Sequence, residues 1–333
     1  MEPEVKKQRI EYIDLMKGFC IIVVVAMHCN LYTNVDLIDT WVSNFRMPLY
    51  FFLSGLFFKK YSGFTEFLVH KVNKVLIPYF FFSWIPYCAL SFLFTSNFTN
   101  PLFWLFAPIM TYNGVLWFLK SLFIAHLFFY LFVHLTQKTS EALKVVILFI
   151  ITLVNVIVVS YAKNFAFMEG YYFITYSFFS AVMSLPFMYV ANIIMRHHLL
   201  NKEMTKRQEI LLIISSLAIA LVSAQHSVWF NIASFGDHFI FMYISALSSI
   251  FALLIICRWL TKLPYVSYVG RYSLIVLGTH FAYLTIIRHY VNWPPYIEFV
   301  IILILMPPSI WFFKKFFPYF TAQKELIKYK KIG

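Results

Sequence analysis

The sequence predicts an all-α polytopic membrane protein, with about ten transmembrane helices in one bundle and both termini in the cytoplasm. Three observations predict it: an apolar composition, regularly spaced apolar segments, and a one-sided distribution of basic residues. Of the 333 residues, 61% are hydrophobic and 12% are charged, whereas soluble proteins have about 25% charged residues. A soluble chain of this length could not bury so much apolar surface, so a bilayer is the expected solvent.

Ten segments have the length and polarity of a spanning helix, which needs roughly 20 mainly apolar residues. They are 13–33, 41–58, 74–96, 115–135, 143–161, 173–195, 209–225, 239–260, 268–290 and 296–317. No linker or low-complexity tract separates them. We therefore expect one domain over residues 1–333, with short basic cytoplasmic tails at 1–12 and 318–333.

Basic residues set the orientation, because Lys and Arg accumulate on cytoplasmic loops. With the N-terminus inside, 23 of the 27 Lys and Arg residues fall on the inner side. Arg46, Lys163 and Arg288 fall outside, and Lys120 falls within a helix. The net charge of +13 is thus a topology signal, and we expect membrane lipids as partners and no nucleic acid.

The first predicted span carries three ionisable residues on one face. Lys17 and His28 are 11 residues apart, which is three turns plus about 20° and a rise of about 16 Å. Asp14 lies three residues before Lys17 and shares that face. An interfacial pair of Asp14 with Lys17 and a histidine used only for packing are the structural alternatives. Ionisable groups inside a membrane, however, usually face a wet cavity and are functional.

Five stretches, in the expected order, resemble the helices of the acyltransferase 3 family of integral membrane acyltransferases. The resemblance is greatest to the fucose 4-O-acetylase-like branch, which O-acetylates sugars of surface polysaccharides. The stretches are RIEYIDLMKGFCIIVVVAMH (9–28), FRMPLYFFLSGLFF (45–58), HKVNKVLIPYFFFSW (70–84), GVLWFLKSLF (114–123) and VGRYSLIVLGTHF (269–281).

The resemblance implies a multi-pass enzyme of a bacterial inner membrane. It would move an acyl group, expected to be acetyl, from cytoplasmic acyl-CoA to a hydroxyl of an extracytoplasmic or lipid-linked sugar. Acyl-CoA would be a co-substrate, with no permanently bound cofactor. Where much of the family has Arg, this chain has Lys17 and Lys71-x-x-Lys74, which keep the charge but lose the bidentate fork.

His28 is the candidate catalytic residue, because an imidazole titrates near neutrality and can accept a hydroxyl proton. It could instead be acylated and pass the group on. The cluster of Lys17, Lys71 and Lys74 is the candidate site for the donor's phosphates, although positive-inside charges and lipid headgroups give an alternative reading. Asp14 lies about 21 Å from His28 along the axis, so we assign it to holding Lys17.

Five other residues complete the predicted site. His280, in the ninth predicted span, either contacts the thioester, the acceptor or His28, or is a satisfied interior histidine. Asn44, Arg46 and Lys120 lie toward the outer side and are candidates for contacting the acceptor, and Trp117 belongs to the same side or to the interfacial belt. No His, Asp or Glu cluster has metal-ligand spacing, so we predict no metal.

Two other functional classes remain open from the sequence. A transporter or flippase of a lipid-linked saccharide would share the helices and the polar interior. It would be favoured by inverted repeats and broken helices, which the sequence does not clearly show. A sensor or assembly protein with this fold would not need His28.

Overall fold

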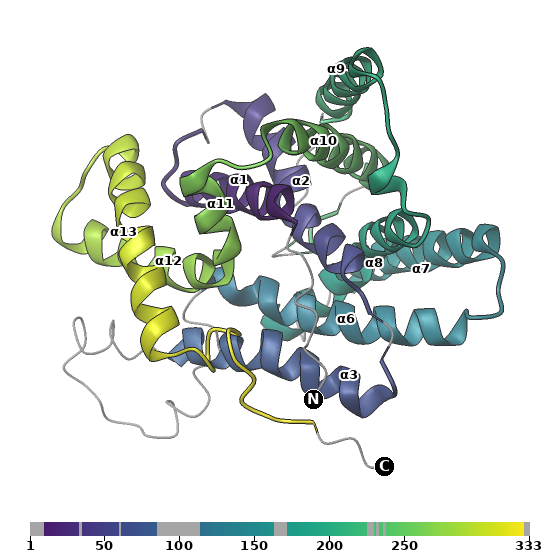
Figure 1. The fold of residues 1–333 in the computed structure, drawn as a ribbon, viewed down its shortest axis with the longest axis horizontal. Coiled ribbons are helices and arrows are strands. Elements are labelled where there is room, and N and C mark those ends of the chain that lie inside the picture. Colours follow the sequence, from purple (N-terminus) through teal and green to yellow (C-terminus); the bar gives the residue numbers. More distant parts are fainter. Residues whose placement is uncertain are drawn as a thin grey trace.

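The computed structural model describes residues 10–32, 35–59, 61–84, 114–162, 172–224, 230, 233–235 and 238–329. Within these ranges the protein is all-helical, as predicted (Figure 1). The α-helices are α1 (Glu11–His28), α2 (Asp36–Leu56), α3 (Phe64–Lys71), α6 (Trp117–Leu135), α7 (Glu141–Ala162), α8 (Tyr172–Arg196), α9 (Lys206–Ser223), α10 (Phe239–Leu260), α11 (Pro264–Arg271), α12 (Ser273–Tyr290) and α13 (Pro295–Phe316).

Eight of the ten predicted spans correspond to one helix each, with ends that agree to within about five residues. The long apolar runs account for this agreement, because length and composition alone mark such helices. The eighth predicted span coincides with α10 at both ends.

The predicted start of the third span, at residue 74, was wrong. The helix begins with α3 at Phe64, passes through a π-helical turn, η1 (Val72–Leu76), and continues through residues 77–84. The rest of the predicted span, 85–96 with Cys88, lies outside the described residues, as do residues 1–9 and 330–333 of the predicted tails. Single π turns inside α-helices frequently occur at functional sites.

The prediction of one continuous helix over 268–290 was also wrong, because α11 ends at Arg271 and α12 begins at Ser273. Directly before this break, α11 packs closely on α1. A Cβ added to Gly270 would lie 1.9 Å from the backbone oxygen of Asp14. A Cβ on Gly18 would lie 2.0 Å from the backbone oxygen of Val266. The two backbones touch here, and the chain then leaves α1 in a new direction as α12 (Figure 1).

Five helical segments of the described chain are long and apolar enough to cross a membrane: Gly114–Leu135, Glu141–Tyr161, Tyr176–Arg196, Phe239–Leu260 and Pro295–Phe316. α1 and α2 each carry three charged residues, yet both contribute heavily to the buried core. The count of ten spans and the cytoplasmic termini stay predictions.

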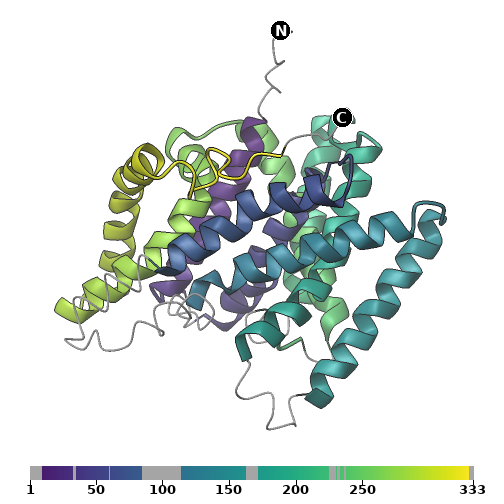
Figure 2. The same cartoon turned by 90° about the horizontal axis from the view of Figure 1, so that it is seen from below.

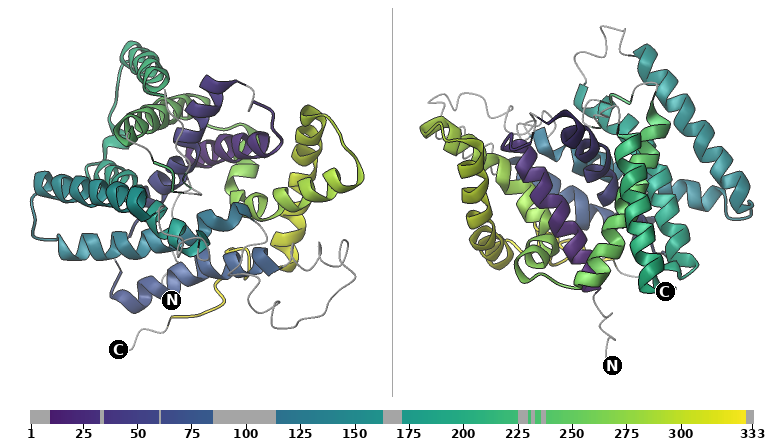
Figure 3. Two further views of the ribbon diagram at one scale, coloured as in Figure 1. Left: turned by 180° about the vertical axis from the view of Figure 1, so that it is seen from behind. Right: turned by 90° about the horizontal axis from the view of Figure 1, so that it is seen from above.

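α1 lies in the middle of the helix bundle, between α10 and α12 (Figure 3). α13 lies beyond α12 at one edge of the molecule, and α7 lies beyond α8 at another (Figure 1). α7 exposes a series of large apolar side chains, as expected of a helix that faces lipid. The start of α1 and the segment after α13 lie on the same side of the molecule (Figure 2).

Candidate active site

A cavity of about 450 Å³ lies between α1, α2, α6 and α12. On α1 its wall consists of Lys17, Ile21 and Val24, which recur at one-turn spacing. His28 follows one turn beyond Val24 on the same face of α1, past the last α1 residue that lines the cavity. On α12, Leu277 lines the cavity one turn before His280. We call this space the central cavity.

Basic side chains gather in the central cavity where the start of α1 meets the ends of α2 and α3. Lys17, Lys59, His70, Lys71 and Lys74 all line it. The structure therefore brings together the three lysines that the sequence predicted for the donor site. We call this group the lysine mouth.

Lys71 is held in an unusual environment for a lysine. Only 8% of the residue is exposed. Its Nζ lies 6.0 Å from the ring centre of Phe58 and 5.9 Å from that of Phe67. It is the last residue of α3, directly before the π-helical turn η1. Burial, together with the positive charge of Lys59, lowers the pKa of Lys71 from 10.5 to about 7.

The segment after α13 folds back onto the lysine mouth. Lys74 Nζ donates a hydrogen bond of 2.8 Å to the backbone oxygen of Ala322. The Asn73 amide donates to the backbone oxygen of Ile327 and accepts from the backbone nitrogens of Leu326 and Ile327. This segment is therefore hydrogen-bonded to η1. Lys74 already donates to one backbone oxygen, whereas the Lys71 ammonium group faces mainly aromatic rings.

His28 and His280 lie next to each other at the far end of the stripe. Their ring centroids are 5.3 Å apart. Nδ1 of His280 is 2.8 Å from the backbone oxygen of Val276, and a carbonyl can only accept, so Nδ1 carries the hydrogen. Nε2 of His280 then has a free lone pair, and it is buried with no hydrogen-bond partner in the described part of the chain.

Charged groups that the sequence analysis did not connect surround His28. Arg288 Nη2 donates to the His28 backbone oxygen at 3.1 Å. The same guanidinium binds both carboxylate oxygens of Glu298, at 2.7 to 3.1 Å. Glu298 is 2% exposed. Glu298 is a carboxylate within an apolar segment. Ionisable residues in such segments are functional candidates, and by this criterion, which selected His28, the sequence could also have indicated Glu298 and its partner Arg288.

Arg46 is the predicted acceptor-side residue that the structure brings near His28. It is 6% exposed and lies within electrostatic range of His28. Its Nη1 is 3.5 Å from the Tyr32 hydroxyl, which donates to the backbone oxygen of Val23. Arg46 thus links α2 to the end of α1.

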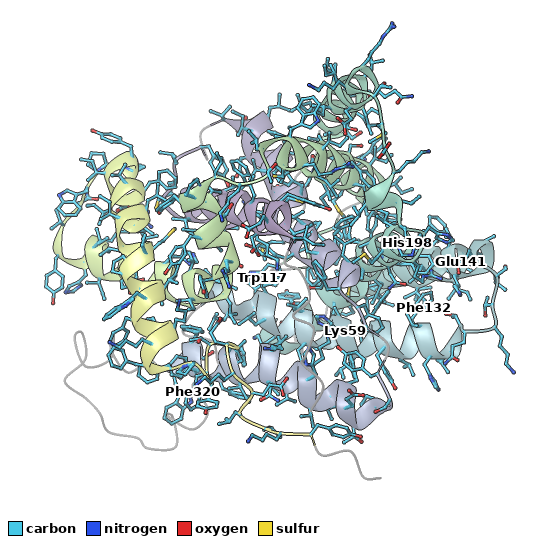
Figure 4. All side chains as sticks on the ribbon, viewed as in Figure 1. Lys59, Trp117, Phe132, Glu141, His198 and Phe320 are labelled. Carbon is cyan, nitrogen blue, oxygen red and sulfur yellow. The ribbon has the colours of Figure 1, made fainter. Side chains whose placement is uncertain are left out.

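None of the other four predicted residues lines the central cavity. Asn44 is fully buried on α2. Trp117 packs against Phe118 near the start of α6 (Figure 4), and the half-buried Lys120 follows one turn later. Asp14 is 5% exposed where α1 meets α11. Their assigned roles stay predictions.

His126, which was not among the predicted site residues, lines the central cavity. It is 4% exposed, and its Nδ1 is 2.7 Å from the backbone oxygen of Leu122. Nδ1 must therefore donate. The place of His126 in the cavity wall follows only from the fold, which packs α6 against the lysine mouth.

Comparison with known families decides the class of enzyme. The model of the acyltransferase 3 family, an acyltransferase domain, matches residues 10–314. The chain belongs to this family. It is therefore a membrane acyltransferase with several transmembrane helices. Searches for similar characterised proteins and similar solved structures found no match.

Proposed function

We propose that this acyltransferase 3 protein transfers an acetyl group from cytoplasmic acetyl-CoA to a hydroxyl of an extracytoplasmic or lipid-linked sugar. One observation supports the proposal most strongly. The central cavity is lined by lysines where α1 begins, and its α1 stripe leads to two adjacent histidines. A donor with phosphates at one end and a thioester at the other fits that polarity.

The donor is proposed to bind with its phosphates in the lysine mouth. Lys17 and Lys71 provide charge there. Ile21, Val24 and Leu277 form an apolar wall between the lysines and the histidines. The rise from Lys17 to His28 is about 16 Å, which an extended pantetheine arm can span. Only this arm has to enter the bundle, and the nucleotide stays at the cytoplasmic face.

His28 is proposed to act as the general base. The acceptor oxygen attacks the thioester carbon, the C–O bond forms, and the C–S bond breaks with the electron pair leaving on sulfur. His28 takes the hydroxyl proton and returns it to the thiolate. His280, with Nε2 as an acceptor, can orient either the acceptor hydroxyl or an N–H of His28. In this neutral form it cannot donate to the thioester oxygen.

The acceptor is proposed to approach from the opposite side, where Arg46 and Arg288 lie near His28. The Arg46 guanidinium favours an acidic sugar or a diphosphate-linked carrier, whereas Glu298 already compensates the charge of Arg288. Purified protein can test the function directly, with acetyl-CoA labelled in the acetyl group and a lipid-linked saccharide fraction from bacterial membranes. Label should appear in the saccharide. If saccharide crosses the bilayer of reconstituted vesicles but never gains label, the chain is a transporter and the proposal fails.

A further inference from the structure

A second cavity, of about 590 Å³, lies beside the central cavity, between the loop after α2 and the ends of α6 and α8. Lys59 and Tyr61 line both cavities, so the two spaces adjoin at these side chains. Figure 4 labels two of its lining residues, Lys59 and Phe132. Its volume is within the range of about 300–1,000 Å³ that is usual for small-molecule sites.

Cations outnumber carboxylates around the second cavity. Lys59, Lys144 and Arg196 line it, and no described carboxylate does. Glu141, next to it, accepts hydrogen bonds from Lys144 at 2.9 Å and from both terminal nitrogens of Arg196 at 3.1 Å. Within the described ranges, no carboxylate forms an ion pair with Lys59. An anionic ligand would supply the missing negative charge.

Aromatic rings form much of the remaining wall. They belong to Phe58, Tyr61, Tyr130, Phe132 and Tyr189. The His134 ring is nearly parallel to that of Tyr130, with an interplanar angle of 3°. Gln137 Nε2 is 2.9 Å from Nδ1 of His134, so Nδ1 accepts and Nε2 carries a hydrogen. A flat ligand with hydrogen-bond acceptors and a phosphate matches these rings and cations, since bases stack on aromatic side chains.

We propose that the second cavity binds the 3′-phosphorylated adenosine end of the CoA donor. This inference rests on the proposed function. The diphosphate would lie at Lys59, where the cavities adjoin, and the pantetheine arm would continue into the central cavity. The 3′-phosphate would bind near Lys144 and Arg196. One ligand would thereby occupy both spaces. An anionic lipid headgroup also carries a phosphate ester but has no base to stack.

Binding measurements on the full-length protein in nanodiscs of uncharged lipid separate these possibilities. The ligands are CoA, 3′-dephospho-CoA and adenosine 3′,5′-bisphosphate. The native protein should bind the bisphosphate in competition with CoA. It should bind dephospho-CoA about tenfold more weakly than CoA, because a charge-assisted contact is lost. Lys144→Gln should lower the affinity for CoA and for the bisphosphate about tenfold and leave the affinity for dephospho-CoA unchanged.

Lys138→Gln is the matched control, since Lys138 is exposed and lines neither cavity; it should change no affinity. Equal affinities of the native protein for CoA and dephospho-CoA, with no bisphosphate binding, would overturn the inference and leave the proposed function standing. Failure to bind CoA at all would overturn both. If anionic lipid in the nanodisc displaces the bisphosphate but not CoA, the cavity is a lipid site and the inference is wrong.

Discussion

The imidazole rings of His28 and His280 lie 5.3 Å apart, one at the end of α1 and the other inside α12. The backbone oxygen of Val276 fixes the tautomer of His280, which leaves Nε2 without a partner in the described chain. This arrangement places a hydrogen-bond acceptor beside the candidate base, where it can orient an N–H of His28 or the acceptor hydroxyl.

Replacing His28 with Ala or Gln should lower acetyl transfer by about 10²–10⁴-fold, the usual contribution of a general base. The variants should insert and accumulate normally, because His28 is the last residue of α1 and is only partly buried. Rates are compared with purified protein at equal concentrations. Turnover of the Ala variant above a tenth of the native rate would remove His28 from the role of base.

Changing Lys71 and Lys74 together to Ala should raise the apparent KM for acetyl-CoA at least tenfold, with a smaller change for the acceptor. Lys71→Ala alone should raise the KM for acetyl-CoA more than Lys74→Ala alone, because Lys74 already donates to the backbone oxygen of Ala322. High salt should reduce the contribution of the more exposed Lys74 more than that of the buried Lys71, since screening acts mainly on exposed charges. Lys202→Ala is the control, at an exposed lysine outside both cavities. An unchanged donor KM in the double variant would assign these lysines to lipid headgroups.

The pH dependence of kcat/KM for acetyl-CoA should reflect the protonation state of Lys71. Its pKa is lowered to about 7, so the cation is present below pH 7 and is lost as the pH rises above it. The kcat/KM for acetyl-CoA should therefore fall above about pH 7. Arg stays protonated throughout this range, so Lys71→Arg should remove that fall. Identical profiles for the two proteins would show that another group controls the donor step.

The contact between α1 and α11 should be intolerant of added volume. Gly270→Ala would place a Cβ 1.9 Å from the backbone oxygen of Asp14, and the backbone cannot give way as a flexible side chain can. Overpacking costs about 1–3 kcal/mol, so the variant should melt at a lower temperature. Gly63→Ala is the control, because nothing lies within 4 Å of its Cβ position. Equal melting of the two variants in detergent would contradict this account of the packing.

The sequence predicted the parts of this structure that depend on length, composition and charge. The apolar run of α10 and the clustering of Lys17 with Lys71 are examples. It could not predict the break at Tyr272, because that depends on how closely Gly270 approaches α1.

The arrangement around the histidines was equally beyond the sequence. Periodicity assigns His28 and His280 each to a face of a helix but does not show that those faces meet. The pairing of Arg288 with Glu298 likewise requires α12 and α13 to be placed relative to each other.

The central claim is that the thioester reaches His28 from the lysine mouth while the hydroxyl meets it from the side of Arg46. Vesicles that contain the protein in one orientation test this most directly. Acetyl-CoA is supplied only on the Lys71 side and the saccharide acceptor only on the Arg46 side, and neither crosses the lipid. Acetylated saccharide should form under these conditions. Product that forms only when both substrates share one side would contradict the account and indicate a one-sided transferase.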